Sequence, residues 1–264
     1  MPPIAILGSL ALDHLGGKTR VGGGAFHGAR GLALDGAEGI VVTKTARPEL
    51  LAPLEAIGLP VRHGEAAAQS TFSLRYDGDV RTMLVEEVGD PWTADDARGW
   101  VAGAVDGIAW LHVAPLHRSD FPAATLAELA RGRRILLDAQ GLVRVPRTGP
   151  LVLDDDYDPE VLRHVAILKL AEEEALALLP DLEPASLAGL GVEEVLVTFG
   201  AKGSLVFVGG SGTEVPANRV DADSTGAGDA FCATYLAARA AGEAPVDAAR
   251  RATALVERML AART

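Results

Sequence analysis

Short apolar runs rich in β-branched residues alternate along this chain with longer stretches rich in alanine and leucine. Several of the runs are apolar throughout, which is typical of strands buried on both faces of a parallel sheet. Strands are predicted over Ile4–Gly8, Ile40–Lys44, Ile108–Val113, Ile135–Asp138, Ala166–Leu170, Val195–Phe199 and Ser204–Val208. Helices are predicted over Ala25–Leu34, Pro48–Ile57, Ala94–Val105, Phe121–Ala130, Glu172–Leu179, Ala227–Ala241 and Pro245–Leu260. The alternation predicts one α/β domain, residues 1–264, with right-handed crossovers.

The segment Ser70–Glu87 departs from this alternation. Its sequence, STFSLRYDGDVRTMLVEE, reads as two alternating runs on either side of Asp77-Gly78, a dipeptide that favours a tight turn. A β-hairpin over residues 70–87, inserted between α/β units, is therefore predicted. It is either an edge hairpin of the main sheet or a flap over a site at the strand ends, and we favour the flap.

Charge and cysteine content exclude some classes of function. The formal net charge is −12, without the basic patch that a nucleic-acid partner requires. No run of roughly 18 apolar residues occurs, so no membrane span is expected. The amino terminus, MPPIAILGSL, lacks the basic start of a signal peptide. Cys232 is the only cysteine, so we expect a protein of the cytoplasm.

The stretch DSTGAGDAF, from Asp223 to Phe231, combines a glycine-rich loop with a carboxylate at the start of an alanine-rich helix. Glycines let backbone N–H groups turn inward, and a helix amino terminus adds unpaired donors and partial positive charge. The loop is therefore a candidate phosphate cradle. Asp229 is either a first-turn acid that favours the helix dipole or the base of a phosphoryl transfer.

Two other glycine-rich stretches do not match familiar nucleotide loops. LDHLGGKT (Leu12–Thr19) ends like a P-loop but has Leu12 where the first glycine is required. GGGAFHG (Gly22–Gly28) has His27 where a dinucleotide fingerprint requires its third glycine. Neither stretch predicts a nucleotide site.

Five segments, in order along nearly the whole chain, resemble the ribokinase (PfkB) family of carbohydrate kinases. They are GSLALDHL (Gly8–Leu15), GGGAFHGARGLALDG (Gly22–Gly36), ILKLAEEEA (Ile167–Ala175), VLVTFGAKGSLVF (Val195–Phe207) and DSTGAGDAF, the most specific of the set. The resemblance implies a three-layer α/β/α ribokinase-like fold with a mostly parallel central sheet and a small β-hairpin lid.

The resemblance also assigns roles to individual residues. Asp229 matches the base that takes a proton from the acceptor hydroxyl, and the amides of Gly226, Ala227 and Gly228 match the anion hole. Two positions depart from the family, because His27 and Ala171 stand where many relatives carry asparagine. The remaining implied contacts are Asp13, Gly23, Gly24 and His27 with the substrate, Thr198, Gly200, Gly203 and Thr225 with the nucleotide, and Glu174 with magnesium through water.

The stretch ILLDAQGLVR, from Ile135 to Arg144, is similar to the inositol-kinase-like branch of the family. It adds Asp138 and Gln140, with Arg144, as candidates for the substrate or phosphate side. Few residues separate Asp13 from Gly22, where many relatives carry lid strands. We therefore expect a small lid built mainly from Ser70–Glu87.

The expected function is that of a cytoplasmic kinase that uses ATP and Mg²⁺ to phosphorylate a hydroxyl of a sugar or cyclic polyol, such as a myo-inositol-like ring. A monovalent cation and a homodimer through paired lids are left open by the resemblance. One alternative is a nucleoside kinase, for which Phe26 and Phe72 are the obvious stacking residues in a chain that is 5% aromatic. Another is a non-catalytic sensor of sugars or nucleotides.

Overall fold

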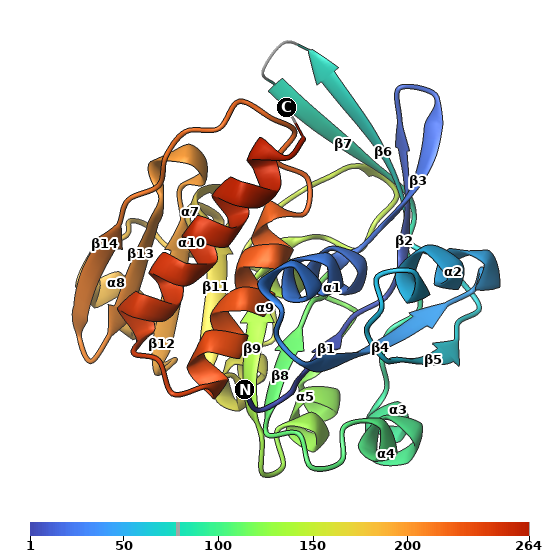
Figure 1. Cartoon of the computed structure of the whole chain (residues 1–264), viewed down its shortest axis with the longest axis horizontal. Coiled ribbons are helices and arrows are strands. Elements are labelled where there is room, and N and C mark those ends of the chain that lie inside the picture. Colours follow the sequence, from blue (N-terminus) through green and yellow to red (C-terminus); the bar gives the residue numbers. More distant parts are fainter. Residues whose placement is uncertain (78–79, 264) are drawn as a thin grey trace.

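The computed structural model describes residues 1–77 and 80–263, and nine strands within them form one sheet (Figure 1). They are β1 (Ile4–Leu7), β4 (Gly39–Thr45), β5 (Val61–Glu65), β8 (Trp110–Val113), β9 (Arg134–Asp138), β11 (Ile167–Ala171), β12 (Glu194–Thr198), β13 (Ser204–Val208) and β14 (Ser211–Val215). Their order is β14-β13-β12-β11-β9-β8-β1-β4-β5. Strands from β5 to β12 pair in parallel, and β13 and β14 add an antiparallel edge.

Helices cover both faces of the sheet, and alternate residues of β1 belong to the two cores. Ile4 and Ile6 share a core with α1 (Gly24–Asp35), α9 (Ala227–Ala240) and α10 (Pro245–Ala261), which lie in front of the sheet in Figure 1. Ala5 and Leu7 share the other core with α5 (Ala123–Leu129), α7 (Glu172–Leu178) and α8 (Pro184–Gly189). The apolar strands are thus buried on both faces, and the predicted three-layer α/β/α fold is confirmed.

A second sheet stands at one end of the first, with the order β10-β7-β6-β2-β3 (Figure 1). Its strands are β2 (Ala11–Leu15), β3 (Lys18–Gly22), β6 (Thr71–Asp77), β7 (Val80–Glu87) and β10 (Gly149–Pro150). The predicted hairpin is present as β6 and β7, within this sheet rather than at an edge of the main one. Gly78 of its predicted turn lies outside the described residues.

A lid built mainly from Ser70–Glu87 stays a prediction. Beside that hairpin, β2 and β3 form a second hairpin, and β2 pairs with β6. Gly16 and Gly17 join these two strands with φ of 57° and 74°. Left-handed conformations at both central residues are what a two-residue hairpin turn needs, and glycine adopts them without strain. The short stretch before Gly22 is therefore long enough to form two paired strands of the second sheet.

Other differences from the predicted elements have local causes. The helix predicted over Ala94–Val105 is divided into α3 (Ala94–Asp96), a π-helical stretch (Ala97–Val101) and α4 (Ala102–Ala104), with Gly99 at a non-helical ψ of −112°. The helix predicted over Pro48–Ile57 is a 3-10 turn (Pro48–Leu50) followed by α2 (Leu51–Glu55). Strands β5 and β14 were not predicted, because they lie at the sheet edges and lack an apolar run.

Candidate active site

A cleft of about 780 Å³ lies between the second sheet, the ends of the parallel strands and the start of α9. It is lined by every residue predicted for the site except Asp138: Asp13, Gly23, Gly24, His27, Gln140, Glu174, Thr198, Gly200, Gly203, Thr225, Gly226, Ala227, Gly228 and Asp229. The carboxyl ends of parallel strands are where open α/β sheets bind ligands. The fold thus brings together residues that are far apart in the sequence.

The predicted phosphate loop (Asp223–Gly228) leads into α9 through Gly226, which caps the helix with φ 77° and ψ 6°. A Cβ on Gly226 would lie 2.4 Å from the ring of His27, so both the conformation and the available space require glycine. The side chain of Asp223 holds the preceding turn by accepting bonds from the backbone N and the Oγ1 of Thr225, at 3.0 Å and 2.7 Å. The backbone N of Ala227 donates to the carbonyl oxygen of Ser224 at 3.0 Å, and residues 226–228 line the cleft beside this braced turn.

Asp229 is buried at the cleft, one residue after the glycine pair of the loop. Its Oδ1 has no hydrogen-bond partner among the described residues. A Cβ on Gly24 would come within 2.9 Å of this oxygen, so the start of α1 must be glycine to leave room for it. Burial, followed by the negative charge of Asp138, raises the pKa of Asp229 to about 7, against the lowering effect of Lys169. A carboxylate with a pKa near neutral is well matched to general-base chemistry.

Asp138 differs from its predicted place, because it lies fully buried beneath the cleft rather than on its surface. Its Oδ2 accepts a hydrogen bond from Nζ of Lys169 at 3.2 Å, and its Oδ1 accepts one from the backbone N of Gln140. Burial alone would raise the pKa of Asp138, but Lys169 and the other partners hold it below its usual value. Asp138 is thus an internal counter-ion and a poor candidate for direct substrate contact.

Lys169 is a site residue that the sequence interpretation missed. It lies in β11 with a side chain only 4% exposed, and its Nζ is 4.0 Å from Oε2 of Glu174. Burial lowers the pKa of Lys169, but Asp138 and Glu174 outweigh it and raise the pKa, so the ammonium is charged. The signal was present in the sequence: a lysine inside the apolar strand ILKLA must find partners when it is buried.

The side of the cleft predicted to hold the acceptor (the acceptor side) is formed by the second sheet and the loops beside it. Asp13 of β2 lies over Gly22, where a Cβ would come within 2.0 Å of the Asp13 carboxylate. Phe72 and Met83, from β6 and β7, and Leu116 give this side an apolar wall. A hydroxyl-rich ring needs this combination of a carboxylate acceptor and an apolar surface for its C–H face.

The side of the cleft predicted to hold the phosphoryl donor (the donor side) is formed by the turn after β12 and by the last helix. Gly200 and Gly203 have φ of 57° and 108°, and a Cβ on Gly203 would lie 2.1 Å from the carbonyl oxygen of Val215. The sequence left the end of this region undefined, and the structure completes it with residues 217–222 and with Thr253, Val256, Glu257 and Leu260 of α10. Both side-chain oxygens of Glu257 accept from Nδ2 of Asn218, which fastens this segment to the helix.

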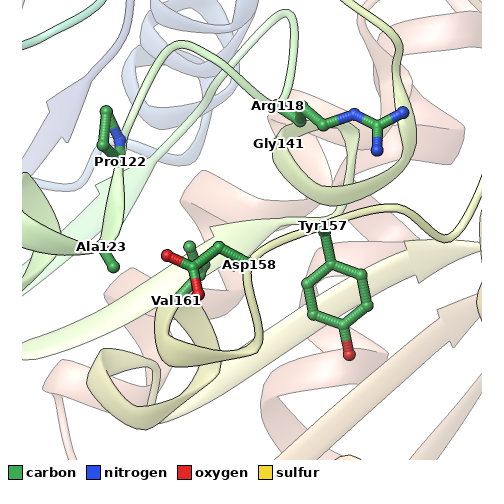
Figure 2. A pocket seen from close by; sticks show the side chains of 7 residues that line it. All are labelled: Arg118, Pro122, Ala123, Gly141, Tyr157, Asp158 and Val161. Carbon is green, nitrogen blue, oxygen red and sulfur yellow. The ribbon is translucent and has the colours of Figure 1, made fainter.

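A smaller cavity of about 190 Å³ lies away from these residues (Figure 2). Two of its polar side chains already have partners: Arg118 pairs with Asp154, and Asp158 accepts from the backbone N of Glu160. It contains none of the predicted site residues, so we place the chemistry in the larger cleft.

The chain is similar to known proteins in sequence and in fold. The model of the "pfkB family carbohydrate kinase" family matches residues 102–256, more than half of the chain. The chain belongs to the pfkB family of carbohydrate kinases. The PfkB prediction is therefore confirmed, and with it the class of enzyme at the level of the family. No helix in the described part of this family member is long and apolar enough to cross a membrane.

A curated relative of this pfkB-family chain is 2-dehydro-3-deoxygluconokinase of Escherichia coli (strain K12), 40% identical over 126 residues. That match covers 39% of this chain and 41% of the relative, so it spans about two fifths of the relative's length.

Solved structures of the same fold include a pyrophosphate-dependent kinase in the ribokinase family complexed with a pyrophosphate analog and myo-inositol. Its TM-score is 0.82 at 24% identity, and the match covers 99% of this chain and 95% of that one. Ribokinase from Thermotoga maritima has a TM-score of 0.75 at 18% identity, with 98% and 93% covered. Arabidopsis thaliana ribokinase complexed with ribose and ATP has a TM-score of 0.75 at 20% identity, with 98% and 93% covered. These likenesses show that the fold is ribokinase-like.

Proposed function

We propose that this chain transfers the terminal phosphoryl group of ATP to a hydroxyl of a sugar or cyclic polyol. The observation that carries the proposal is the position of Asp229. Its Oδ1, which has no hydrogen-bond partner among the described residues, lies at the cleft directly after residues 226–228 in the chain. Asp13, which is predicted to bind the acceptor substrate, lines the same cleft. A base for the hydroxyl and donors for the phosphate thus meet at one point.

The steps assigned to the chain's own residues follow from this arrangement. Asp13 and the backbone at Gly23 and Gly24 bind acceptor hydroxyls, and the second sheet covers them. Asp229 accepts the proton of the attacking hydroxyl, while the amides of Gly226, Ala227 and Gly228 stabilise the charge that grows on the phosphoryl oxygens. Positioning and pre-arranged electrostatics supply most of the acceleration in such a transfer.

Magnesium fits the acidic groups on the donor side. Glu172, Glu173 and Glu174 line the cleft at the start of α7, and Oε2 of Glu174 is oriented by the backbone N of Ala171 at 2.8 Å. Mg²⁺ keeps several waters and is usually held by one or two carboxylates together with substrate phosphates. Glu174 would hold it through water, and the ion would neutralise phosphate charge.

Pyrophosphate is a second candidate donor, because one structure of the same fold is a pyrophosphate-dependent kinase whose match covers 99% of this chain. The extent of the cleft favours ATP. It continues past the phosphate loop to residues 217–222 and to α10, whereas pyrophosphate would fill only the part around the loop. The nucleoside-kinase alternative is weakened on the acceptor side, because Phe72 lines the cleft but Phe26 does not appear among its lining residues.

The decisive experiment is a screen of wild-type enzyme with ATP or pyrophosphate against sugars, inositols, 2-dehydro-3-deoxygluconate and nucleosides, with the phosphorylated product identified. We expect turnover with a sugar or polyol and ATP. The variant Asp229→Asn should lose about 10²–10⁴-fold in kcat and still bind the donor. Near-normal turnover by this variant would show that Asp229 is not the base. Binding without turnover by the wild type would instead support the sensor alternative.

The cytoplasmic location, a monovalent cation and a homodimer stay predictions from the sequence.

A further inference from the structure

The buried ion pair between Lys169 and Asp138 lies against the phosphate loop. The pair joins Lys169, in the middle of β11, to Asp138, at the end of β9. Both side chains are almost completely removed from solvent, at 4% and 0% exposure. Burying a lysine is costly unless its partners are close and well aligned, so such a residue calls for an explanation beyond packing.

The ammonium of Lys169 touches the loop at Gly228. A Cβ built on Gly228 would lie only 3.1 Å from Nζ of Lys169. Gly228 is the second residue of α9, so the charge is placed directly beside the helix amino terminus. Two positive features, the ammonium and the helix end, therefore converge one residue before Asp229.

The charges around Asp229 come from every element packed against it. Carboxylates approach from β9 (Asp138) and from α7 (Glu174), and cations from β11 (Lys169) and from Arg144, the residue after α6 (Gln140–Val143). The remaining titratable neighbours are Cys232 on the same helix, His112 of β8 facing Asp138, His27 of α1 against Gly226, and Glu257 of α10 at the cleft.

The negative and positive charges in this set nearly offset one another. Asp138, Glu174 and Asp229 bring three carboxyl groups into one buried volume, and Lys169 is the one fully buried cation among the groups that act on Asp229 in the described chain. Arg144 is only half-buried. Without Lys169, ionising Asp229 would place a further negative charge beside Asp138 and Glu174 with much weaker compensation.

We propose that Lys169 is a positioning residue of the phosphoryl transfer: paired with Asp138, it places a fixed positive charge beneath the anion hole and keeps Asp229 in the ionised form that can accept a proton. The proposal rests on the proposed function in that it treats Asp229 as the base. It adds a residue that acts through Asp229, without itself contacting the acceptor hydroxyl.

The test follows the ionisation of Asp229 directly, by carbon-13 NMR of protein labelled at the aspartate carboxyl carbons, with Asp229→Asn used to assign the signal. Lys169→Met should move the titration midpoint of Asp229 to higher pH by about one unit or more. Asp138→Asn should move it to lower pH. The double variant should return it close to the wild-type midpoint, because a neutral pair replaces the ion pair.

The activity of each variant should change in step with the ionised fraction of Asp229. Since the midpoint of Asp229 lies near pH 7, an upward shift of one unit lowers its ionised fraction at pH 7 from about one half to about one tenth, so kcat/KM of Lys169→Met near neutral pH should fall at least about fivefold and recover at higher pH. Lys169→Arg, which keeps the charge, should retain a midpoint close to that of the wild type. A loss of packing alone would lower activity at all pH values and would leave the midpoint in place.

Lys44 offers a matched control, because it is also a buried lysine in an ion pair, with Asp96 at 3.1 Å, and lies outside the cleft. Lys44→Met should destabilise the protein and leave the Asp229 midpoint unchanged. The proposal is overturned if Lys169→Met moves the midpoint no more than Lys44→Met does. It is also overturned if Asp138→Asn moves the midpoint of Asp229 upward. This second measurement still tests the proposal if Lys169→Met fails to fold. Because the NMR titration needs no turnover, it separates this proposal from a failure of the proposed activity.

Discussion

Replacing Asp229 with asparagine keeps the shape of the side chain and removes its charge. The folded protein raises the pKa of this carboxyl from its ordinary value of 3.8 to about 7, first through burial and then through Asp138. Between those two values the folded chain holds a proton that the unfolded chain has released. The stability of the wild type must therefore fall as the pH rises through this window, whereas the asparagine variant is spared that loss.

The size of the effect follows from the same numbers. A pKa difference of one corresponds to about 1.4 kcal/mol, so the raised pKa of Asp229 costs the wild type about 4 kcal/mol above pH 7 and less than about 1 kcal/mol near pH 4. The amide adds a constant cost if its N–H groups find no acceptor. We therefore predict the difference between the two proteins: relative to wild type, Asp229→Asn should gain about 3 to 4 kcal/mol of unfolding free energy between pH 4 and pH 8.

The assay is urea unfolding of both proteins across this pH range, with no donor or acceptor present. Asp247→Asn is the matched control, because Asp247 is also a first-turn acid, in α10, but is exposed and pairs with Arg250. Its effect should stay within about 1 kcal/mol at every pH. If the stability difference between Asp229→Asn and wild type is flat from pH 4 to pH 8, Asp229 is not a buried carboxyl under charge repulsion, and the reasoning fails.

Two further variants test the acceptor side and the packing that supports it. Asp13→Ala should raise KM for the acceptor far more than it lowers kcat, since in the proposed function Asp13 binds hydroxyls without taking part in the proton transfer; an unchanged KM and substrate preference would remove Asp13 from the site. Gly31→Ala should destabilise the protein by about 1–3 kcal/mol or more in thermal unfolding, because its Cβ would lie 2.6 Å from the backbone of Ala230 where α1 crosses α9. Wild-type stability in Gly31→Ala would show that these two helices can separate.

The sequence was most informative where a single local rule decides the structure. Apolar runs identified the parallel strands, and DSTGAGDAF identified the loop that leads into α9, because both signals lie within a few residues of one another. The hairpin of β2 and β3 was not predicted, for a different reason. β2 has only two buried residues, Ala11 and Leu12, and β3 is mostly exposed, so their pairing was visible only in the Gly16-Gly17 turn signal between them.

The roles of the buried charged residues could be predicted only in part, because the partner of each charge depends on which strands become neighbours. Asp138 was expected to contact substrate from its place at the end of an apolar strand. Whether such a carboxylate faces the cleft or an internal partner depends on β9 pairing with β11, where Lys169 stands directly beside Asp138 in the register. That pairing joins residues distant in the sequence, and no local pattern specifies it.

Under the proposed function, the loop before α9 has two tasks that conflict electrostatically. It attracts a polyphosphate and keeps a carboxylate ionised beside it. While the loop is empty, the positive end of α9 favours the charge on Asp229. A bound phosphate occupies the same amides and adds negative charge, so the support from the helix is weakest at the moment when the base is needed. The proposed Mg²⁺ comes with the donor phosphates, whereas Lys169, held by Asp138 against Gly228, is a cation that stays in place throughout. On a scaffold whose neighbouring strand lacked such a charge, we expect a larger share of this carboxyl to be protonated at neutral pH.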